Sequence, residues 1–317
     1  MTKRIVAVLA LSLASTSAFA SQAHNIVSGG GDADRILCAN GMCGSFYTND
    51  EYNIFWNPAL INGQKGYAVI ENQNTSGTSA GFVTDVANFN LGVFLNRPLN
   101  TFGADRAVDV VLGGETGVKW GVGLTHALSE GAPKFTKLNA GVVVSDFEPF
   151  VSYTIKNTDG ATSESKATDM TIGTRYHYGE WTPYAAYRTS KATAAGVEAS
   201  ESGSAYGLGL GRMTKMGEVK MDYAVSYWHT GGANPKTSVV PVEMSASVDA
   251  SSWLVVRAGF SHDLIARGIT PATSTRLGGT FKMGKADLDM VVKKDGTTGE
   301  FGFSDDLVAN AGLTYRW

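Results

Sequence analysis

After its first twenty residues, the sequence lacks any hydrophobic run that could form a membrane-spanning helix. Such a helix needs about 20 predominantly apolar residues, and no run of 18 or more follows residue 20. Charged residues are also scarce, at 17% of the 317 residues, against about 25% in an average soluble domain. If the chain lies in a membrane, it must form a closed β-barrel, because only helices and closed barrels satisfy every backbone hydrogen bond in lipid.

The sequence has little that would support catalysis, metal binding or nucleic-acid binding. Its net charge of -3 provides no basic field for nucleic acid. The five histidines show no metal-binding spacing. The run Gly77-Thr78-Ser79-Ala80-Gly81 matches G-x-S-x-G, but a strand pattern follows it where a nucleophile elbow needs a helix. His262 and Asp263 are neighbours in a strand pattern and should face opposite sides. We predict no enzyme activity, no cofactor and no metal.

The first twenty residues, MTKRIVAVLALSLASTSAFA, have the three parts of a secretory signal peptide. A basic start at Lys3 and Arg4 precedes an apolar run, and small residues at Ala18 and Ala20 precede Ser21. This pattern predicts cleavage before Ser21, so residues 1–20 are the expected signal peptide and the mature chain is exported.

Residues 21–65 contain the only two cysteines, Cys38 and Cys43, in the run CANGMC. In an exported protein the pair is expected to form a small disulfide loop, with a free redox pair as the alternative. We interpret residues 21–65 as a plug or periplasmic segment that precedes the barrel.

From about residue 66, the pattern of residues 66–317 predicts a barrel domain of antiparallel strands. In EVKMDYAVSYWH, for example, apolar residues at alternate positions lie opposite Lys220 and Asp222. The connections are alternately short and long, as at the two rims of an outer-membrane barrel. There are 38 glycines in the sequence, about 12% against a usual level of about 7%.

The strand count follows from this pattern and from the expectation that both termini lie on the periplasmic side. Twelve clear strands extend back from Trp317 to about Gly117, and residues 66–96 add two or more. Both termini on one side require an even number, so we predict an all-β, up-and-down transmembrane barrel of about 14 strands, with 12 and 16 as alternatives. Residues 97–116 could be a strand, a periplasmic excursion or an inward-folded loop.

Aromatic residues gather near the ends of the predicted strands, which favours two girdles at the membrane interfaces. The residues assigned to the girdles are Tyr176, Tyr178, Trp181, Tyr184, Tyr187, Tyr227, Trp228, Tyr315 and Trp317.

If the apolar strand faces point to lipid, the opposite faces make a charged lumen. Such a lumen suits water, solutes or a charged plug, although ion pairs that fill a narrow barrel are an alternative. Basic residues exceed acidic ones on this face, which motivates a hypothesis of weak anion preference. The candidate selectivity residues are Lys119, Lys156, Arg175, Arg188, Lys220, Asp222, Glu243, Arg257, Arg276 and Lys282.

The last residues, with Leu313, Tyr315 and Trp317 at alternate positions, resemble the C-terminal assembly signal of Gram-negative outer-membrane proteins. Most members of that group end in Phe, and Trp is a variant of the pattern. The resemblance implies recognition by the barrel-assembly machinery. It also implies a place in the cell outer membrane, in contact with its lipid and lipopolysaccharide.

The stretch NDEYNIFWNPALINGQKGY, with Asn57-Pro58-Ala59, resembles the Asn-Pro-Ala segment of FadL-type transporters and their porin-like relatives. The resemblance covers about 20 residues and implies an N-terminal hatch folded into the barrel. The chain departs from that family in its shorter length, its cysteine loop and its charged inner face.

Together these patterns predict a porin for passive diffusion of small hydrophilic solutes, and a homo-oligomer is possible. Two alternatives remain open. One is a FadL-like transporter of hydrophobic molecules gated by the hatch, and the other is a closed structural or surface-interaction barrel.

Overall fold

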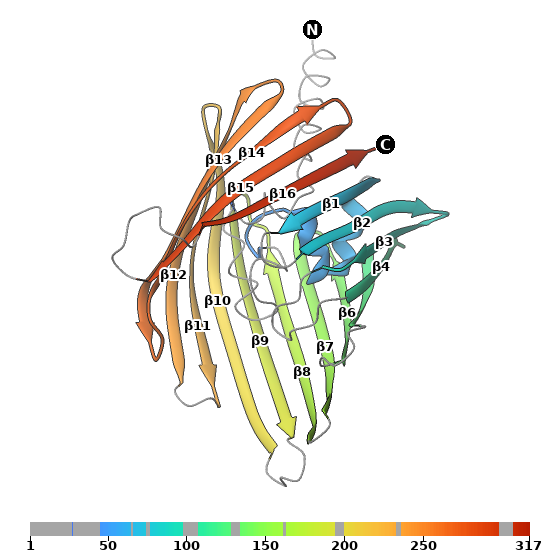
Figure 1. The fold of residues 1–317 in the computed structure, drawn as a ribbon, viewed down its shortest axis with the longest axis vertical. Coiled ribbons are helices and arrows are strands. Elements are labelled where there is room, and N and C mark those ends of the chain that lie inside the picture. Colours follow the sequence, from blue (N-terminus) through green and yellow to red (C-terminus); the bar gives the residue numbers. More distant parts are fainter. Residues whose placement is uncertain are drawn as a thin grey trace.

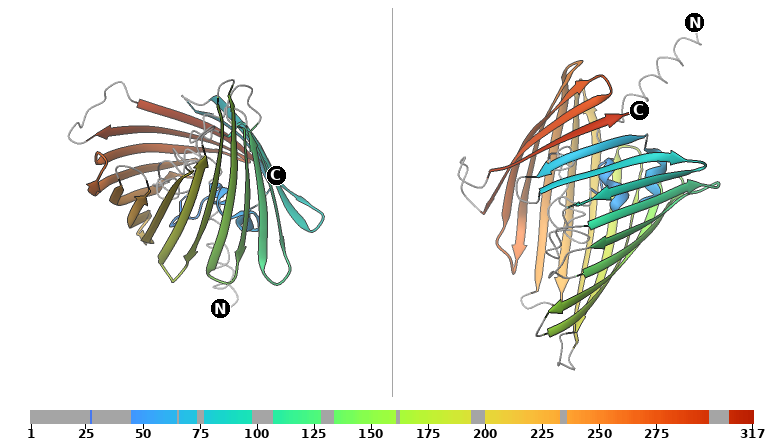
Figure 2. Two further views of the ribbon diagram at one scale, coloured as in Figure 1. Left: turned by 90° about the horizontal axis from the view of Figure 1, so that it is seen from below. Right: turned by 45° about the vertical axis from the view of Figure 1, so that its right-hand side comes forward.

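The chain forms a closed antiparallel β-barrel of sixteen strands in which each strand pairs with its neighbours in sequence and β1 pairs with β16 (Figures 1 and 2). The structure is a computed structural model that describes residues 27, 45–64, 66–73, 77–97, 107–127, 134–160, 163–193, 200–232, 236–297 and 307–317. The predicted signal cleavage site (Ala18, Ala20, Ser21) and the predicted Cys38–Cys43 disulfide lie outside the described residues and stay predictions.

The first six strands are short and most of the later ones are longer. The short strands are β1 (Tyr67–Gln73), β2 (Gly77–Val86), β3 (Phe89–Leu95), β4 (Ala107–Glu115), β5 (Lys119–Ala127) and β6 (Lys134–Val143). The others are β7 (Phe147–Gly160), β8 (Ser163–Tyr176), β9 (Trp181–Thr193), β10 (Ser200–Met216), β11 (Val219–Gly231), β12 (Thr237–Ser251), β13 (Leu254–Arg267), β14 (Ala272–Met283), β15 (Ala286–Thr297) and β16 (Leu307–Arg316).

The all-β barrel prediction is confirmed, and the strand number is sixteen, the upper alternative, where we predicted about fourteen. The twelve strands expected after Gly117 are present as β5 to β16. Residues 66–96 hold three strands, and the uncertain stretch 97–116 contains β4. The hairpin between β2 and β3 has Ala87 at a φ of 55°. Glycine or asparagine usually takes that conformation, so this turn has little sequence signature.

The two rims of the barrel differ in their connections, as predicted. The tight turns, such as residues 87–88 between β2 and β3 and residues 284–285 between β14 and β15, share one rim with the C-terminus (Figure 1). Longer connections such as residues 96–106 and 298–306 belong to the opposite rim. We call these the short-turn rim and the long-loop rim.

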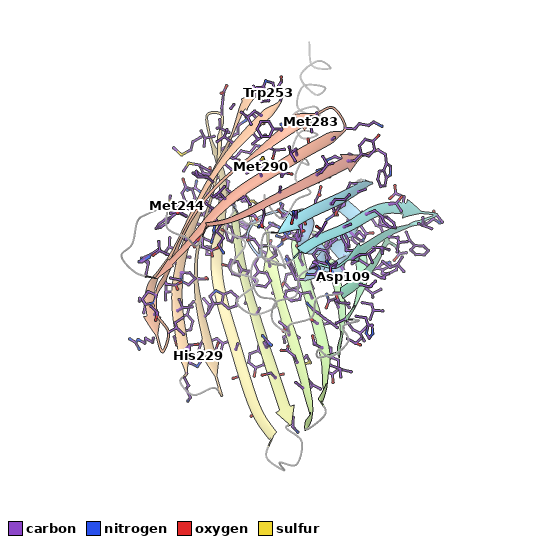
Figure 3. The ribbon with its side chains drawn as sticks, in the orientation of Figure 1. Asp109, His229, Met244, Trp253, Met283 and Met290 are labelled. Atoms are coloured by element: carbon purple, nitrogen blue, oxygen red, sulfur yellow. The ribbon has the colours of Figure 1, made fainter. Side chains whose placement is uncertain are left out.

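The two faces of the wall differ in polarity, because successive side chains of a strand point to opposite sides. On β5, Val122 and Leu124 are 48% and 41% exposed on the outside, whereas Thr125 is buried on the inside. Figure 3 shows exposed apolar residues along the outer wall, with Trp253 and Met283 at the short-turn rim. Within the described residues, no helix is both long and apolar enough to cross a membrane.

Most of the predicted girdle aromatics are exposed on the outer wall, but two are not. Tyr178, Trp181 and Trp317 are exposed near the short-turn rim. Tyr184 and Trp228 are 4% and 5% exposed and pack inside the barrel, so their assignment to a girdle was wrong. The two residues were assigned to a girdle because they lie near strand ends. The alternation of side chains along the strand decides which face of the wall a residue is on, and it places both inside.

The seam between β1 and β16 offers a test of closure and register. Val69 and Thr314 are Cα partners with buried, inward side chains. The Trp317 N–H donates to the Gly66 carbonyl, so these two residues form a hydrogen-bonded pair. Hydrogen-bonded and non-hydrogen-bonded pairs alternate along an antiparallel ladder, which makes Val69–Thr314 a non-hydrogen-bonded pair. The Cα separation of such a pair, about 4.5 Å, permits a disulfide.

With Cys38 and Cys43 replaced by serine, V69C/T314C is expected to cross-link on oxidation. The control V69C/L313C should not, because Leu313 faces outward. Mass spectrometry after digestion detects the bond, and a cross-link in the control alone would contradict the register.

Candidate functional site

A segment of the chain before β1 lies inside the barrel, close to β1–β6 (Figure 2). We call residues 45–64 the internal segment. It contains two short 3-10 helices, η1 (Glu51–Phe55) and η2 (Pro58–Gly63). The Asp50 carboxylate caps η1 by accepting from the Tyr52 N–H at 2.7 Å.

The Asn57-Pro58-Ala59 motif starts η2 and places it against the wall. The Asn57 side-chain oxygen accepts from the Ala59 N–H at 3.1 Å, and Pro58 takes the first helical position. This is the usual N-terminal chemistry of a helix, since asparagine satisfies a free N–H and proline has none to lose. Asn57 and Ala59 are completely buried. The motif therefore has a structural role here, and the FadL-type resemblance stays a prediction.

Glycines on the inner wall let the internal segment approach the strand backbone. A Cβ atom added at Gly121 of β5 would lie 2.3 Å from the Pro58 carbonyl carbon. At Gly141 of β6 it would lie 2.0 Å from the Asn57 side-chain oxygen, and at Gly113 of β4 it would lie 2.4 Å from Ile61 Cγ2. No side chain fits at these three positions without movement of the segment. The contact explains part of the high glycine content.

Side-chain amides connect the internal segment to the wall. Asn62 donates to the Trp120 carbonyl of β5 at 2.8 Å and accepts from Asn90 of β3 at 2.9 Å. Asn139 of β6 donates to the Phe55 carbonyl at 2.8 Å. Each bond satisfies a backbone or amide group that is withdrawn from water, which would otherwise cost free energy.

Arg175 of β8 fastens the other end of the internal segment. Its guanidinium donates to the Thr48 carbonyl at 2.8 Å and to the Asn49 side-chain oxygen at 3.0 Å. It also pairs with Glu148 of β7, and only 1% of the Arg175 side chain is exposed. The structure thus places this predicted selectivity residue against the internal segment and away from free solvent, and its part in selectivity stays a prediction.

An aromatic cluster joins the internal segment to β7, β9 and β11 in the lumen. We define it as Phe46, Trp56, Phe150, Tyr184 and Trp228, all at most 5% exposed. The ring centroids of Phe46 and Tyr184 are 5.5 Å apart, and those of Trp56 and Phe150 are 5.0 Å apart. These rings pack against one another, as aromatic side chains do in a protein core.

Glycines of β10 make room for this cluster. A Cβ added at Gly207 would lie 2.0 Å from the Trp228 ring, and one at Gly209 would lie 2.2 Å from the Tyr184 ring. Large rings on β9 and β11 can therefore lie flat along the inner wall only because β10 between them has glycine at these positions.

Most of the remaining predicted lumen residues face inward, as expected, and several are paired. Arg188 pairs with Asp169, Arg257 with Asp289 at 3.7 Å and Lys282 with Asp249 at 3.0 Å. Asp222 accepts from the Ser245 hydroxyl at 3.1 Å. Glu243 and Arg276 are buried, and Lys119 and Lys220 are half-buried. Lys156 belongs to β7, and its side chain is outside the described part.

The sequence analysis did not identify the ion pair between Arg97 and Asp109 in the lumen. Arg97 makes two hydrogen bonds to Asp109 of β4, at 3.0 and 2.8 Å, and lies 3.9 Å from the centre of the Phe55 ring. Thr125 also donates to Asp109 at 2.5 Å. Figure 3 labels Asp109 in this part of the wall. The sequence feature that could have indicated this pair is Asp109, the acid within the apolar run AVDVVLGGE.

Glu51 connects the internal segment to the last strand. Its carboxylate accepts from Arg316 at 2.9 Å, and its other oxygen is buried without a hydrogen bond within the described residues. Burial raises the pKa of Glu51 well above its ordinary range, although the charge of Arg316 opposes the shift. A proton on Glu51 is therefore more favourable in the docked segment than in solvent.

In the described part of the chain, no three His, Cys, Asp or Glu side chains come together in a way that could hold a metal ion. His262 and Asp263 face opposite sides of β13, as the alternation predicted. His262 contacts Thr273 at 2.8 Å, and Asp263 accepts from the Ala272 N–H at 3.1 Å.

The glycine contact gives a matched pair of substitutions on one face of β5. Gly121→Ala is expected to displace Pro58 and to lower the free energy of unfolding by about 1–3 kcal/mol. Gly123→Ala is the control, because its Cβ would meet Pro58 Cγ at an ordinary 3.4 Å. Denaturant unfolding gives the free energies, and hydrogen exchange of residues 57–61 reports docking. Equal free energies of unfolding and equal hydrogen exchange in the two variants would show that the internal segment does not contact Gly121.

No model of a known family matches the sequence, and no curated protein matches it. Among solved structures, a porin refined at 1.8 Å resolution is similar with a TM-score of 0.48 and 12% identity, over 80% of this chain and 98% of that chain. OmpT of Vibrio cholerae has a TM-score of 0.43 and 10% identity, over 80% and 96%. Wzi, a carbohydrate-binding β-barrel involved in group 1 capsule assembly in Escherichia coli, has a TM-score of 0.42 and 6% identity, over 81% and 86%.

Proposed function

We propose that the barrel spans the outer membrane of a Gram-negative cell. The closed sheet leaves no strand edge unpaired, which lipid requires. Exposed apolar residues on the outer wall would be costly in water and are favourable against acyl chains. The outward positions of Leu313, Tyr315 and Trp317, at 45%, 49% and 54% exposure, fit a last strand that ends at a membrane interface.

Within that membrane, we infer passive diffusion of small hydrophilic solutes through the lumen, with no chemical step. The observation that carries this inference is the polar inner wall on β11, β14 and β15. There Lys220, Asp222, Lys282 and Lys293 remain half-exposed on β11, β14 and β15. Charged groups of this kind are expected along a water-filled passage and are costly in a dry core.

In this proposal the internal segment is a fixed constriction. It contacts wall glycines, its side-chain amides donate to wall carbonyls, and Arg175 and Arg316 hold it from two further strands. A hatch for hydrophobic molecules would call for an apolar pocket beneath it. The aromatic cluster occupies that part of the lumen with rings that pack on one another, which favours the hydrophilic channel over the FadL-like alternative.

The test is the conductance of the refolded chain from Ser21 onward in a planar bilayer. We expect steady, ohmic steps, because a fixed constriction leaves the passage open. Deletion of residues 45–64 should enlarge the steps by widening the lumen. Folding of both proteins is checked by comparing their electrophoretic mobility before and after the sample is heated. A silent full chain that conducts only after deletion would contradict passive diffusion and favour a gated transporter, and silence of both would favour a closed barrel.

A further inference from the structure

A groove lies on the outer wall where β8, β9 and β10 approach the long-loop rim (Figure 1). Its volume is about 550 Å³, which is within the size range of small-molecule sites. Tyr153, Met170 and Tyr187 line the groove and are exposed on the outer wall. The groove therefore opens toward the membrane, and it is separate from the lumen.

Three cross-strand rows of side chains give the groove its shape. Tyr187 and its Cα partner Tyr206 form the edge nearer the short-turn rim. Thr189 and Ser204 are the next outward pair of Cα partners, and their short side chains lie along the floor. Lys191 lies at the edge nearer the long-loop rim. The hollow exists because two small hydroxyl side chains separate a row of large rings from a lysine.

The row of tyrosines lies where the apolar part of the outer wall ends. On the short-turn side of Tyr206, Leu208 and Leu210 of β10 are exposed on the same face. Tyrosine rings favour the level of the lipid headgroups, and the longer loops of an outer-membrane barrel face the outside of the cell. In the proposed membrane, the groove is thus at the headgroup level of the outer leaflet.

The polar groups of the groove suit an anionic headgroup. Two of the residues that line it are charged, Lys191 and Asp169. The Asp169 carboxylate belongs to the inner face and pairs there with Arg188, whereas Lys191 is exposed on the outer face. An ammonium group can donate to phosphate oxygens, and the hydroxyls of Thr189 and Ser204 can donate to phosphate or exchange hydrogen bonds with a sugar. Such hydroxyls would be costly against acyl chains alone.

We propose that this groove binds the headgroup of a single outer-leaflet lipid that carries sugar and phosphate groups. Lys191 contacts a phosphate, Thr189 and Ser204 bond to the headgroup from below, and the Tyr187 ring packs against a sugar. The acyl chains then continue along the apolar wall past Leu208. The inference rests on the proposed place of the barrel in the outer membrane, and it does not require an open lumen.

The experiment is native mass spectrometry of the refolded chain from Ser21 onward, released from detergent after incubation with lipid A, a diphosphorylated glucosamine lipid. A second sample receives the same lipid with its phosphates removed. We expect one molecule of the phosphorylated lipid to stay bound and the dephosphorylated lipid to be retained about fivefold less, because a charge-assisted contact is lost. Equal retention of the two lipids, or retention of neither, would overturn the site.

Two outward substitutions locate the binding, each with a matched control. Lys191→Gln should lower retention of the phosphorylated lipid about fivefold, and Arg267→Gln, which removes an exposed cation three strands beyond β10, should not. Ser204→Leu should fill the hollow and lower retention similarly, whereas Thr136→Leu on the outer face of β6 should not. Wild-type retention in K191Q or in S204L would overturn the site, as would an equal loss in a control. Either variant decides the test if the other does not fold.

Conductance of the same samples separates this inference from the proposed channel. A protein that conducts in a planar bilayer but retains neither form of lipid A refutes only the groove. A protein that retains the phosphorylated lipid but stays silent supports the groove and refutes the channel.

Discussion

The architecture depends on close contact between the internal segment and glycines of the barrel wall. A barrel of sixteen strands encloses more space than its own inward side chains fill. Gly121 permits the Pro58 backbone to lie directly on β5, and Gly141 permits the Asn57 side chain to lie on β6. Gly207 and Gly209 permit aromatic rings to lie on β10. Removal of side chains from the wall is thus what lets one part of the lumen pack as a dry core.

Electrostatics divides the lumen into regions with different roles. Where the internal segment docks, arginines are buried with acidic partners and also bind its backbone, as Arg175 does with Thr48. Such pairs position the segment, since the loss of either partner would leave a buried charge uncompensated. Near the start of β11, Lys220 and Asp222 are half-exposed and can meet water. Arg276 fits neither role, because it is buried and no carboxylate in the described part of the chain pairs with it.

Sequence reasoning reached the fold because a period of two is a strong signal over long strands. It assigned the inward faces of β5, β8 and β13 and the outward face of the last strand as the structure has them. It left β4 open because the connection before it, residues 96–106, obscures where the hairpin begins. It placed Tyr184 and Trp228 in a girdle because a sequence does not show that the lumen holds its own aromatic cluster.

The candidate site was less accessible from sequence, since its contacts join residues far apart in the chain. The Asn57-Pro58-Ala59 run was noticed, but nothing near it indicates Gly121 or Gly141 as its contacts. Charged residues on the inner face were identified by alternation alone. Which of them would form an ion pair, as Arg257 does with Asp289, depends on cross-strand register and rotamers.

The central claim is that solutes pass while the internal segment stays docked. It is tested most directly by locking the segment to the wall through a disulfide. In a protein with Cys38 and Cys43 replaced by serine, Asn62→Cys and Asn90→Cys place two thiols where the side-chain amides of the internal segment and β3 are now 2.9 Å apart. Single-channel current is then recorded before and after reduction. We predict the same conductance in both states, and a current that appears only after reduction would show that the segment must move.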